Sequence, residues 1–351
     1  MSEAFSPAVR LWIEKQALLV AAQKRFWEEW GQMLRGVKRR LAAKGWQSRT
    51  YNEPPDIIQL YRPGWPGGVA QVHYEVLCHE EFRQQGIVDF SLHFEDRLPN
   101  QEQVCARMRQ LIRPHARGIL AACACSMPDE PLHDILKGSL ELVGVTGDKI
   151  VAMVEAMAQT ESFVDEAVAL AGCATVWRTG FTEDDAPDWL NWFGSAGGQE
   201  IIRGAGRFGS TALRIDGTRP NARTHDIPKS CYSVPLHPTH GIQNACECCV
   251  AVVLKTETGG TLRIWTEGHE GKTAEGHPKK LPKAFSFSAP VDGADHWQCV
   301  SFRASVPSFE AAKYDFARDG TWMAVNVLTP DKTFLIDSIE VALCPSGRQV
   351  S

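Results

Sequence analysis

The chain has 351 residues, of which 44% are hydrophobic and 23% are charged. This composition is typical of a soluble globular protein and excludes a largely disordered one, and the length suits two domains. No apolar run approaches the roughly 20 residues that span a bilayer, so the sequence predicts no membrane-spanning helix. The net charge of −5 makes a nucleic-acid partner unexpected, because an acidic surface repels phosphates.

The first residues and the cysteines bear on the compartment. Glu3, Arg10, Glu14 and Lys15 interrupt the apolar character of the N-terminus, which therefore makes a poor secretory signal. We expect a cytoplasmic protein, or one whose leader has been removed. The eleven cysteines cannot all pair within the chain, and we expect reduced, buried thiols.

Charge is distributed unevenly along the first hundred residues. Residues 1–50 hold ten Lys or Arg against four Glu, whereas residues 51–100 hold three Arg against eight acidic residues. We expect these segments to pack together and partly neutralise each other, and the alternative is a basic face for nucleic acid.

Residues 8–45 show helical periodicity. Apolar residues recur three and four positions apart and form one stripe: Phe26, Trp30, Met33, Leu34, Val37 and Leu41. Gly45 suits a C-terminal cap, and we expect a break near Ala22 that divides the segment into two helices.

Strand patterns follow this helix. Residues 56–62 form a short run, and residues 70–76 and 88–94 alternate apolar and polar side chains, which indicates antiparallel strands with one apolar face. Asn100 begins a further predicted helix, and residues 132–172 have a mostly helical pattern. The sequence therefore predicts an α+β domain over residues 1–172, with helices on a small antiparallel sheet.

The polar face of this predicted sheet carries the residues best suited to catalysis. They are His73, Glu75, Asp89, His93 and Glu95. Imidazoles and carboxylates that converge from two neighbouring strands can hold a divalent metal ion and activate water. The alternative is the solvated face of a one-sided sheet, which is favoured because no Lys follows at the acid-x-Lys spacing of metal-dependent nucleases.

Residues 179–345 alternate short apolar runs with Gly, Pro and Asp, which predicts an all-β sandwich. Three phrases mark it in chain order. The segment from Gly180 begins Gly-Phe-Thr-Glu, that from Gly209 is Gly-Ser-Thr-Ala-Leu-Arg-Ile-Asp, and that from Phe334 is Phe-Leu-Ile-Asp-Ser-Ile-Glu-Val. A Gly-Gly pair at 259–260 suits a hairpin turn between them.

In order and wording these phrases resemble the carbohydrate-binding modules of the family 4/9 type, which have a galactose-binding-like jelly roll. The resemblance implies a jelly-roll domain over residues 179–345 and a structural calcium ion with Glu183 and Asp337 among its ligands. The sequence departs from the family at Thr182, which precedes Glu183, and at Ser338, where the family has a second Asp. Two ligands are fewer than the six to eight oxygens that calcium takes.

Sugar binding by such a domain requires exposed aromatic rings, on which the apolar face of a pyranose stacks. Trp189, Tyr232, Trp265 and Trp322 are the candidate platform, and Arg214 is a candidate polar contact. The alternative is that most of these rings belong to the core.

A cluster of cysteines at 246, 248 and 249 lies near His237 and His240. Strand alternation turns Cys246 and Cys248 toward the core with Val250, so core packing is favoured over a zinc site.

The sequence contains no nucleophile elbow, phosphate loop or HExxH motif, so enzyme activity is not the leading expectation. The leading hypothesis is a non-enzymatic binding or attachment protein, such as a phage or virion structural component, whose sandwich recognises a glycan or a protein partner. The alternative is a metal-dependent hydrolase or nuclease that uses the polar face at residues 73–95. A third hypothesis takes both domains as protein-interaction surfaces. The oligomeric state is left open.

Overall fold

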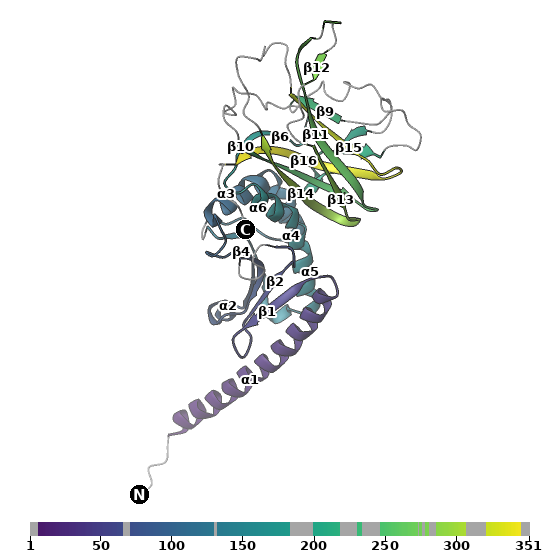
Figure 1. The fold of residues 1–351 in the computed structure, drawn as a ribbon. Coiled ribbons are helices and arrows are strands. Elements are labelled where there is room, and N and C mark those ends of the chain that lie inside the picture. The colour runs from purple at the N-terminus through teal and green to yellow at the C-terminus, as the bar shows by residue number, and fades with distance from the viewer. Residues whose placement is uncertain are drawn as a thin grey trace. The chain divides into compact units, whose positions relative to one another are not determined.

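Figure 1 shows the fold in the computed structural model, which describes residues 6–65, 71–129, 132–182, 199–217, 230–233, 246–272, 274–275, 278–280, 286–306 and 321–344. Its contacts divide the chain into two compact units. The first unit comprises Met1–Gln101 and Leu120–Ala158, and the second comprises Glu102–Ile119 and Gln159–Ser351. The second unit thus includes helical residues that the sequence prediction assigns to the first domain.

One helix, α1 (Pro7–Ala42), opens the first unit. Ser6 caps it, because its Oγ accepts a hydrogen bond from the amide of Val9 at 3.4 Å. The predicted break near Ala22 is wrong: the surrounding residues are Ala, Leu and Gln, which favour an uninterrupted helix. Among the described helices, none is long and apolar enough to cross a bilayer.

The first unit contains a five-stranded sheet in which every strand runs antiparallel to its neighbour. In sheet order the strands are β1 (Gln47–Tyr51), β2 (Ile57–Tyr61), β3 (Val72–Leu77), β4 (Ile87–Phe94) and β5 (Asp134–Glu141). A short helix, α2 (Glu80–Gln84), connects β3 to β4. The predicted antiparallel sheet is confirmed.

The strand β5 corrects the sequence prediction of a mostly helical segment over residues 132–172. Only α5 (Gly147–Ala158) and α6 (Glu161–Ala169) are helical there, apart from a short turn at Leu142–Gly144. Pairing along the whole of β4 satisfies the backbone groups of residues 134–141, and this tertiary pairing outweighs a weak local preference for helix. A side chain at Gly138 would press on Cys125 Sγ, 3.0 Å away, so the small residue suits this edge.

One face of this sheet is apolar, as the alternation predicts. The buried residues on it are Val72, Tyr74, Val76, Val88, Phe90, Leu92 and Phe94. The opposite, polar face is also largely buried: His73 and Ser91 have no exposed surface, and Asp89 is 8% exposed. The interpretation as a solvated face is therefore wrong, because a polar residue on a strand can be covered when its partners are polar too.

The second unit is a β-sandwich of two antiparallel sheets. The first sheet has the order β14-β10-β16-β8-β7, with β6 also paired to β16. Its strands are β6 (Ala174–Thr179), β7 (Gln199–Ile202), β8 (Ala212–Asp216), β10 (Cys246–Thr256), β14 (Ala294–Val306) and β16 (Thr333–Cys344).

The second sheet has the order β12-β11-β15-β9, with β13 also paired to β11. Its strands are β9 (Ser230–Ser233), β11 (Gly260–Lys272), β12 (Pro278–Lys280), β13 (Ser286–Val291) and β15 (Thr321–Val327). Leu213, Val250 and Ile339 of the first sheet share one core with Ile264 and Val325 of the second. Two sheets on one core confirm the predicted sandwich, whereas the jelly-roll topology stays a prediction.

A β-bulge interrupts the closing strand β16. Val253 pairs with Ser338 and Leu254 pairs with Ile336, so Asp337 is an extra residue in the ladder. Core positions change parity at this point, from Ile336 before the bulge to Ile339 after it. The strict alternation predicted for residues 334–341 is therefore wrong, and the bulge redirects Asp337.

The outer face of the first sheet is covered by α6, which packs on β10 and β14. Cys249, Ala251 and Ala342 are buried there, so β10 is apolar on both faces. Cys248 lies in the sandwich core with Val250, as the alternation predicts.

A disulfide joins Cys173 to Cys344. The expectation that all thiols are reduced is wrong for this pair, since the two residues are brought together across 171 positions of sequence. Seven further cysteines in the described part of the chain are free, and six of them are buried. Burial raises the pKa of Cys123 to about 11 and that of Cys125 to about 12, which makes these thiols unreactive.

The two remaining helices of the second unit's side of the division are short. They are α3 (Gln101–Ile112) and α4 (Ala116–Cys123), and α4 begins in the second unit and ends in the first.

Candidate functional site

Two histidines stand directly opposite each other on the polar face of the first unit. His73 in β3 pairs with His93 in β4, and their rings lie 5.3 Å apart between centroids. Directly opposed residues of an antiparallel pair project from the same face, so the strand register alone brings the two imidazoles together.

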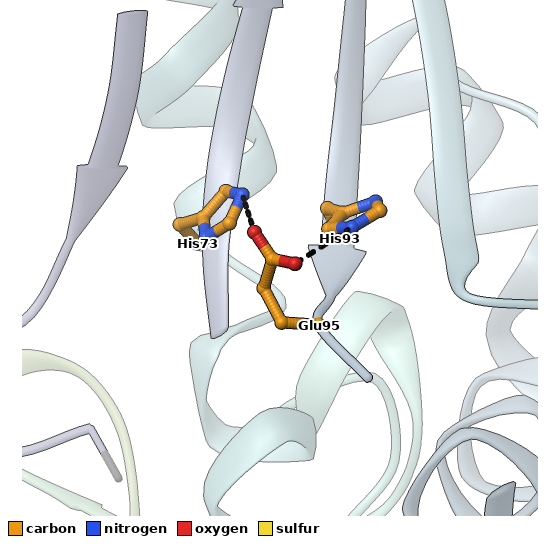
Figure 2. Close-up of side chains that lie close together, drawn as sticks. All are labelled: His73, His93 and Glu95. Atoms are coloured by element: carbon orange, nitrogen blue, oxygen red, sulfur yellow. Dashed lines mark ion pairs between the residues drawn. The ribbon is translucent and has the colours of Figure 1, made fainter. Parts of the chain in front are cut away.

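Glu95 reaches the space between these imidazoles from just beyond the end of β4 (Figure 2). One carboxylate oxygen lies 3.9 Å from Nε2 of His73, and the other lies 3.9 Å from Nε2 of His93. The amide of Glu95 donates to the carbonyl of Gln71 at 2.8 Å, which extends the ladder and holds this residue beside the sheet. Two ring nitrogens and one carboxylate thus face a common point.

Asp134 of β5 orients His93 from the other side. Its Oδ1 lies 2.8 Å from His93 Nδ1, while its Oδ2 lies 3.0 Å from Nζ of Lys137. Burial alone would lower the pKa of His93, but the hydrogen bond to Asp134 and the nearby carboxylates raise it overall. For Asp134, burial would raise the pKa, and its bonds to His93 and Lys137 lower it.

Gln59 and Glu75 hold His73. The amide nitrogen of Gln59 lies 2.9 Å from His73 Nε2 and donates to Glu75 Oε1 at 2.7 Å, and His73 Nε2 lies 2.9 Å from the same oxygen. Burial would raise the pKa of Glu75, but these hydrogen bonds lower it overall. The Gln59 side-chain oxygen and the Ser91 hydroxyl, both on this face, are buried without a hydrogen-bond partner.

The structure therefore brings four of the five predicted polar residues together. They form, with two further residues, what we call the histidine cluster: Gln59, His73, Glu75, His93, Glu95 and Asp134. The fifth, Asp89, is opposite Leu77 further along the ladder, and burial raises its pKa. Gln59 and Asp134 were missed, because Gln59 lies in a short unassigned run and Asp134 in a segment predicted as helix.

A second buried cluster lies in the second unit around Arg207, which has no exposed surface. Its Nε donates to Asp337 Oδ2 at 2.8 Å and its Nη2 donates to Glu166 Oε2 at 3.0 Å. Ser162 and Ser338 accept further bonds from the guanidinium, each at 3.3 Å. We call these five residues the Arg207 cluster. Nothing in the Gly-rich turn at 204–209 signals that its arginine is buried.

Asp337 is thus the counterion of Arg207. Its Oδ1 also accepts from the Arg207 amide at 2.8 Å and from Ser210 Oγ at 2.5 Å. Burial would raise the pKa of Asp337, but the charge of Arg207 and these hydrogen bonds lower it overall. Glu183, its predicted companion in calcium binding, lies outside the described residues. The calcium site stays a prediction.

A pocket of about 580 Å³ adjoins the Arg207 cluster within the second unit. Arg107, Arg178, His115 and Phe208 are among its lining residues. Arg107 and Arg178 both pair with Glu340, a carboxylate with no exposed side-chain surface. The pocket's cations are therefore engaged within the fold.

The candidate sugar-binding residues fall largely outside the described structure. Trp189 lies outside the described residues, and so do the side chains of Tyr232, Trp265 and Trp322, whose backbone positions are described. Arg214 is half-exposed on β8 and pairs with Asp216 at 3.2 Å.

The register of the second sheet relates these backbone positions. Position 265 pairs with 324 and position 322 pairs with 267, so the two tryptophans stand diagonally on adjacent strands. These positions alternate with the buried core residues Ile264 and Val325. Tyr232 pairs with Met323 and so has the parity of the core positions.

No protein-family model and no curated protein matches the sequence. Among solved structures, the C-terminal family 22 carbohydrate binding module of Clostridium thermocellum Xyn10B is 14% identical, over 50% of this chain and 97% of that chain, with a TM-score of 0.30. A carbohydrate binding module of Cellvibrio mixtus lichenase 5A, in complex with cellotriose, is 7% identical over 48% and 97%, with a TM-score of 0.27. The xylan-binding domain of Paenibacillus barcinonensis Xyn10C is 9% identical over 42% and 82%, with a TM-score of 0.26. At these scores the likenesses carry no argument, and the sandwich assignment follows from the pairings and shared core of the chain itself.

Proposed function

We propose that the protein is a non-enzymatic glycan-binding protein and that the outer face of the sheet β12-β11-β15-β9 carries its binding site. The observation that carries the proposal is the diagonal placement of positions 265 and 322, both out of phase with the core.

Two tryptophans at diagonal positions are separated by roughly 7–8 Å along the sheet, within reach of one another for large side chains. Flat rings spaced in this way suit the apolar faces of successive sugar units, while polar groups take the hydroxyls. Arg263 pairs with Asn326 and Glu267 pairs with Trp322, so donors and acceptors occupy neighbouring positions of the same parity. The resemblance of the sequence to carbohydrate-binding modules supports the same ligand class.

The test is glycan-array binding followed by affinity electrophoresis of the full chain. We expect Trp265→Ala and Trp322→Ala each to weaken binding at least about tenfold, the equivalent of about 1.4 kcal/mol. The matched control is Trp12→Ala, because Trp12 is a 62% exposed tryptophan on α1. Full retention by both sandwich variants would sink the proposal, and so would the absence of any glycan ligand for the folded wild-type chain.

The finer role is attachment, with the sandwich recognising a glycan or protein partner and the first unit serving assembly, as in a phage or virion component. This role rests on analogy, and co-purification of the chain with intact particles tests it. A hydrolase or nuclease reaction at the histidine cluster would need a bound metal ion and an attacking water, and it stays a prediction.

A further inference from the structure

We propose that His73, His93 and Glu95 of the first unit bind a divalent transition-metal ion of the zinc class. The proposal is independent of glycan binding, since every residue that carries it lies in the first unit.

The first support is the separation of the ligand atoms. The candidate atoms of the three residues all lie within 4.8 Å of one another, and the carboxylate lies 3.9 Å from each imidazole nitrogen. Ligands about 2.1 Å from a tetrahedral zinc ion are about 3.4 Å apart, so small side-chain rotations suffice to close the site. Figure 2 shows the carboxylate between the two rings, with one oxygen directed to each.

The second support is the way the imidazoles are held. His93 Nδ1 bonds to Asp134, which leaves Nε2 directed at Glu95. A carboxylate on the far nitrogen is the usual partner of a metal-binding histidine, because it fixes the tautomer and increases the basicity of the ligand. At His73, a metal ion would take the place of the proton between Nε2 and Glu75 Oε1, and Gln59 would continue to hold that carboxylate.

The third support comes from polar atoms that the fold leaves without a partner. Gln59 is 5% exposed and Ser91 is fully buried, yet the side-chain oxygen of each lacks a hydrogen bond. Orphaned buried acceptors are costly and uncommon in native proteins, and they accumulate where a ligand completes the site. Ser91 is directly opposite Glu75 in the ladder, and Gln59 contacts His73, so both belong to this face.

The donor set selects the class of metal. Two imidazole nitrogens and one carboxylate suit zinc, iron or cobalt, whereas calcium and magnesium prefer all-oxygen sites. With three protein ligands the fourth position remains available to water, the arrangement of an open rather than a purely structural zinc site. Glu95, whose side chain is 36% exposed, gives this site access to solvent.

A neighbouring group competes for the same assignment. His93, His133 and Asp134 also have ligand atoms within 4.8 Å of one another. We favour the first group because Asp134 is already engaged by His93 Nδ1 and by Lys137, so it is better placed to orient His93 than to bind the ion.

The experiment is calorimetric titration of the full, chelator-stripped chain with Zn²⁺, and with Mg²⁺ as the hard-ion comparison. We expect one Zn²⁺ per chain and Mg²⁺ binding at least about 100-fold weaker. Glu95→Gln and His93→Gln should each weaken Zn²⁺ binding at least about tenfold. The matched control is His79→Gln, because His79 also pairs with a carboxylate, Asp56 at 3.0 Å, but lies outside the cluster.

Cobalt substitution separates this site from the free thiols. The Co²⁺ form should show visible bands of a nitrogen and oxygen site without a thiolate charge-transfer band. Glu95→Gln is the decisive variant if His93→Gln unfolds, because its side chain is partly exposed and the change is isosteric.

Three results would overturn the assignment. They are no saturable Zn²⁺ binding by the folded wild type, unchanged binding in Glu95→Gln, and a thiolate band that accounts for all bound Co²⁺. Loss of binding in His133→Gln with retention in Glu95→Gln would also overturn it in favour of the neighbouring group.

Discussion

The Arg207 cluster of the second unit and the histidine cluster of the first unit are both buried, but their polar atoms are paired to different degrees. Every carboxylate around Arg207 has a cationic partner within 3.0 Å, and the arginine is bonded on both sides. In the histidine cluster, Gln59 has an orphaned oxygen, and Glu95 lies 3.9 Å from both imidazoles, too far for a hydrogen bond.

This difference separates a structural network from a candidate binding site. A fully paired buried network fixes a unique packing, here of α6 against the sandwich, and offers nothing further to a ligand. A cluster with converging lone pairs and orphaned atoms is incomplete by itself. The comparison predicts that removing a polar group should damage the first kind of cluster and can improve the second.

The largest expected effect is at Arg207. Arg207→Met removes the cation and leaves Glu166 and Asp337 buried without compensation, which should lower the free energy of unfolding by about 3–5 kcal/mol. Urea unfolding of the full chain measures this. Arg214→Met is the control, since its half-exposed pair with Asp216 should contribute less than about 1 kcal/mol. A loss below that of the control would mean that the cluster is not a structural network.

A smaller effect is expected at Asp337, and it should depend on pH. Asp337→Asn removes a charged hydrogen-bond partner of Arg207 and should cost about 2 kcal/mol at pH 7. Because the pKa of Asp337 is lower in the folded state, its contribution is present above the unfolded value near 4 and is lost as pH falls through the folded pKa.

Urea unfolding of wild type and Asp337→Asn at a series of pH values measures this dependence. The stability difference should be constant above about pH 5 and shrink below about pH 4. A difference that grows on acidification contradicts the assignment of Asp337 as the counterion.

The smallest effect has the opposite sign. Ser91→Ala removes a buried hydroxyl without a partner, so it should stabilise the metal-free chain by about 1 kcal/mol. Ser162→Ala in the Arg207 cluster is the matched control and should destabilise, because its hydroxyl accepts a bond from Arg207. Equal losses in both variants would remove the distinction between the clusters.

Much of the candidate site in the first unit follows from local pattern. Period-two alternation assigns Val72 and Val88 to the core face and therefore His73 and His93 to the opposite face. Once the two strands pair antiparallel, the convergence of these histidines needs only the correct register. The burial of that face was not predictable, because alternation distinguishes the two sides of a strand without revealing what covers them.

The remaining partners come from distant segments. Asp134 reaches His93 only because residues 134–141 pair with β4, and their local pattern favoured helix. The β-bulge at Asp337 and the burial of Arg207 likewise depend on contacts across more than a hundred residues, and no local period encodes them.

The sequence by itself determined that the chain is globular, that an α1-type helix precedes an antiparallel sheet, and that a β-sandwich follows, because hydrophobic periodicity is a local property. The tertiary structure alone decided which charges are buried and which groups meet them. A buried ion is tolerated only where its partner is held in place, and that partner is supplied by a remote part of the chain.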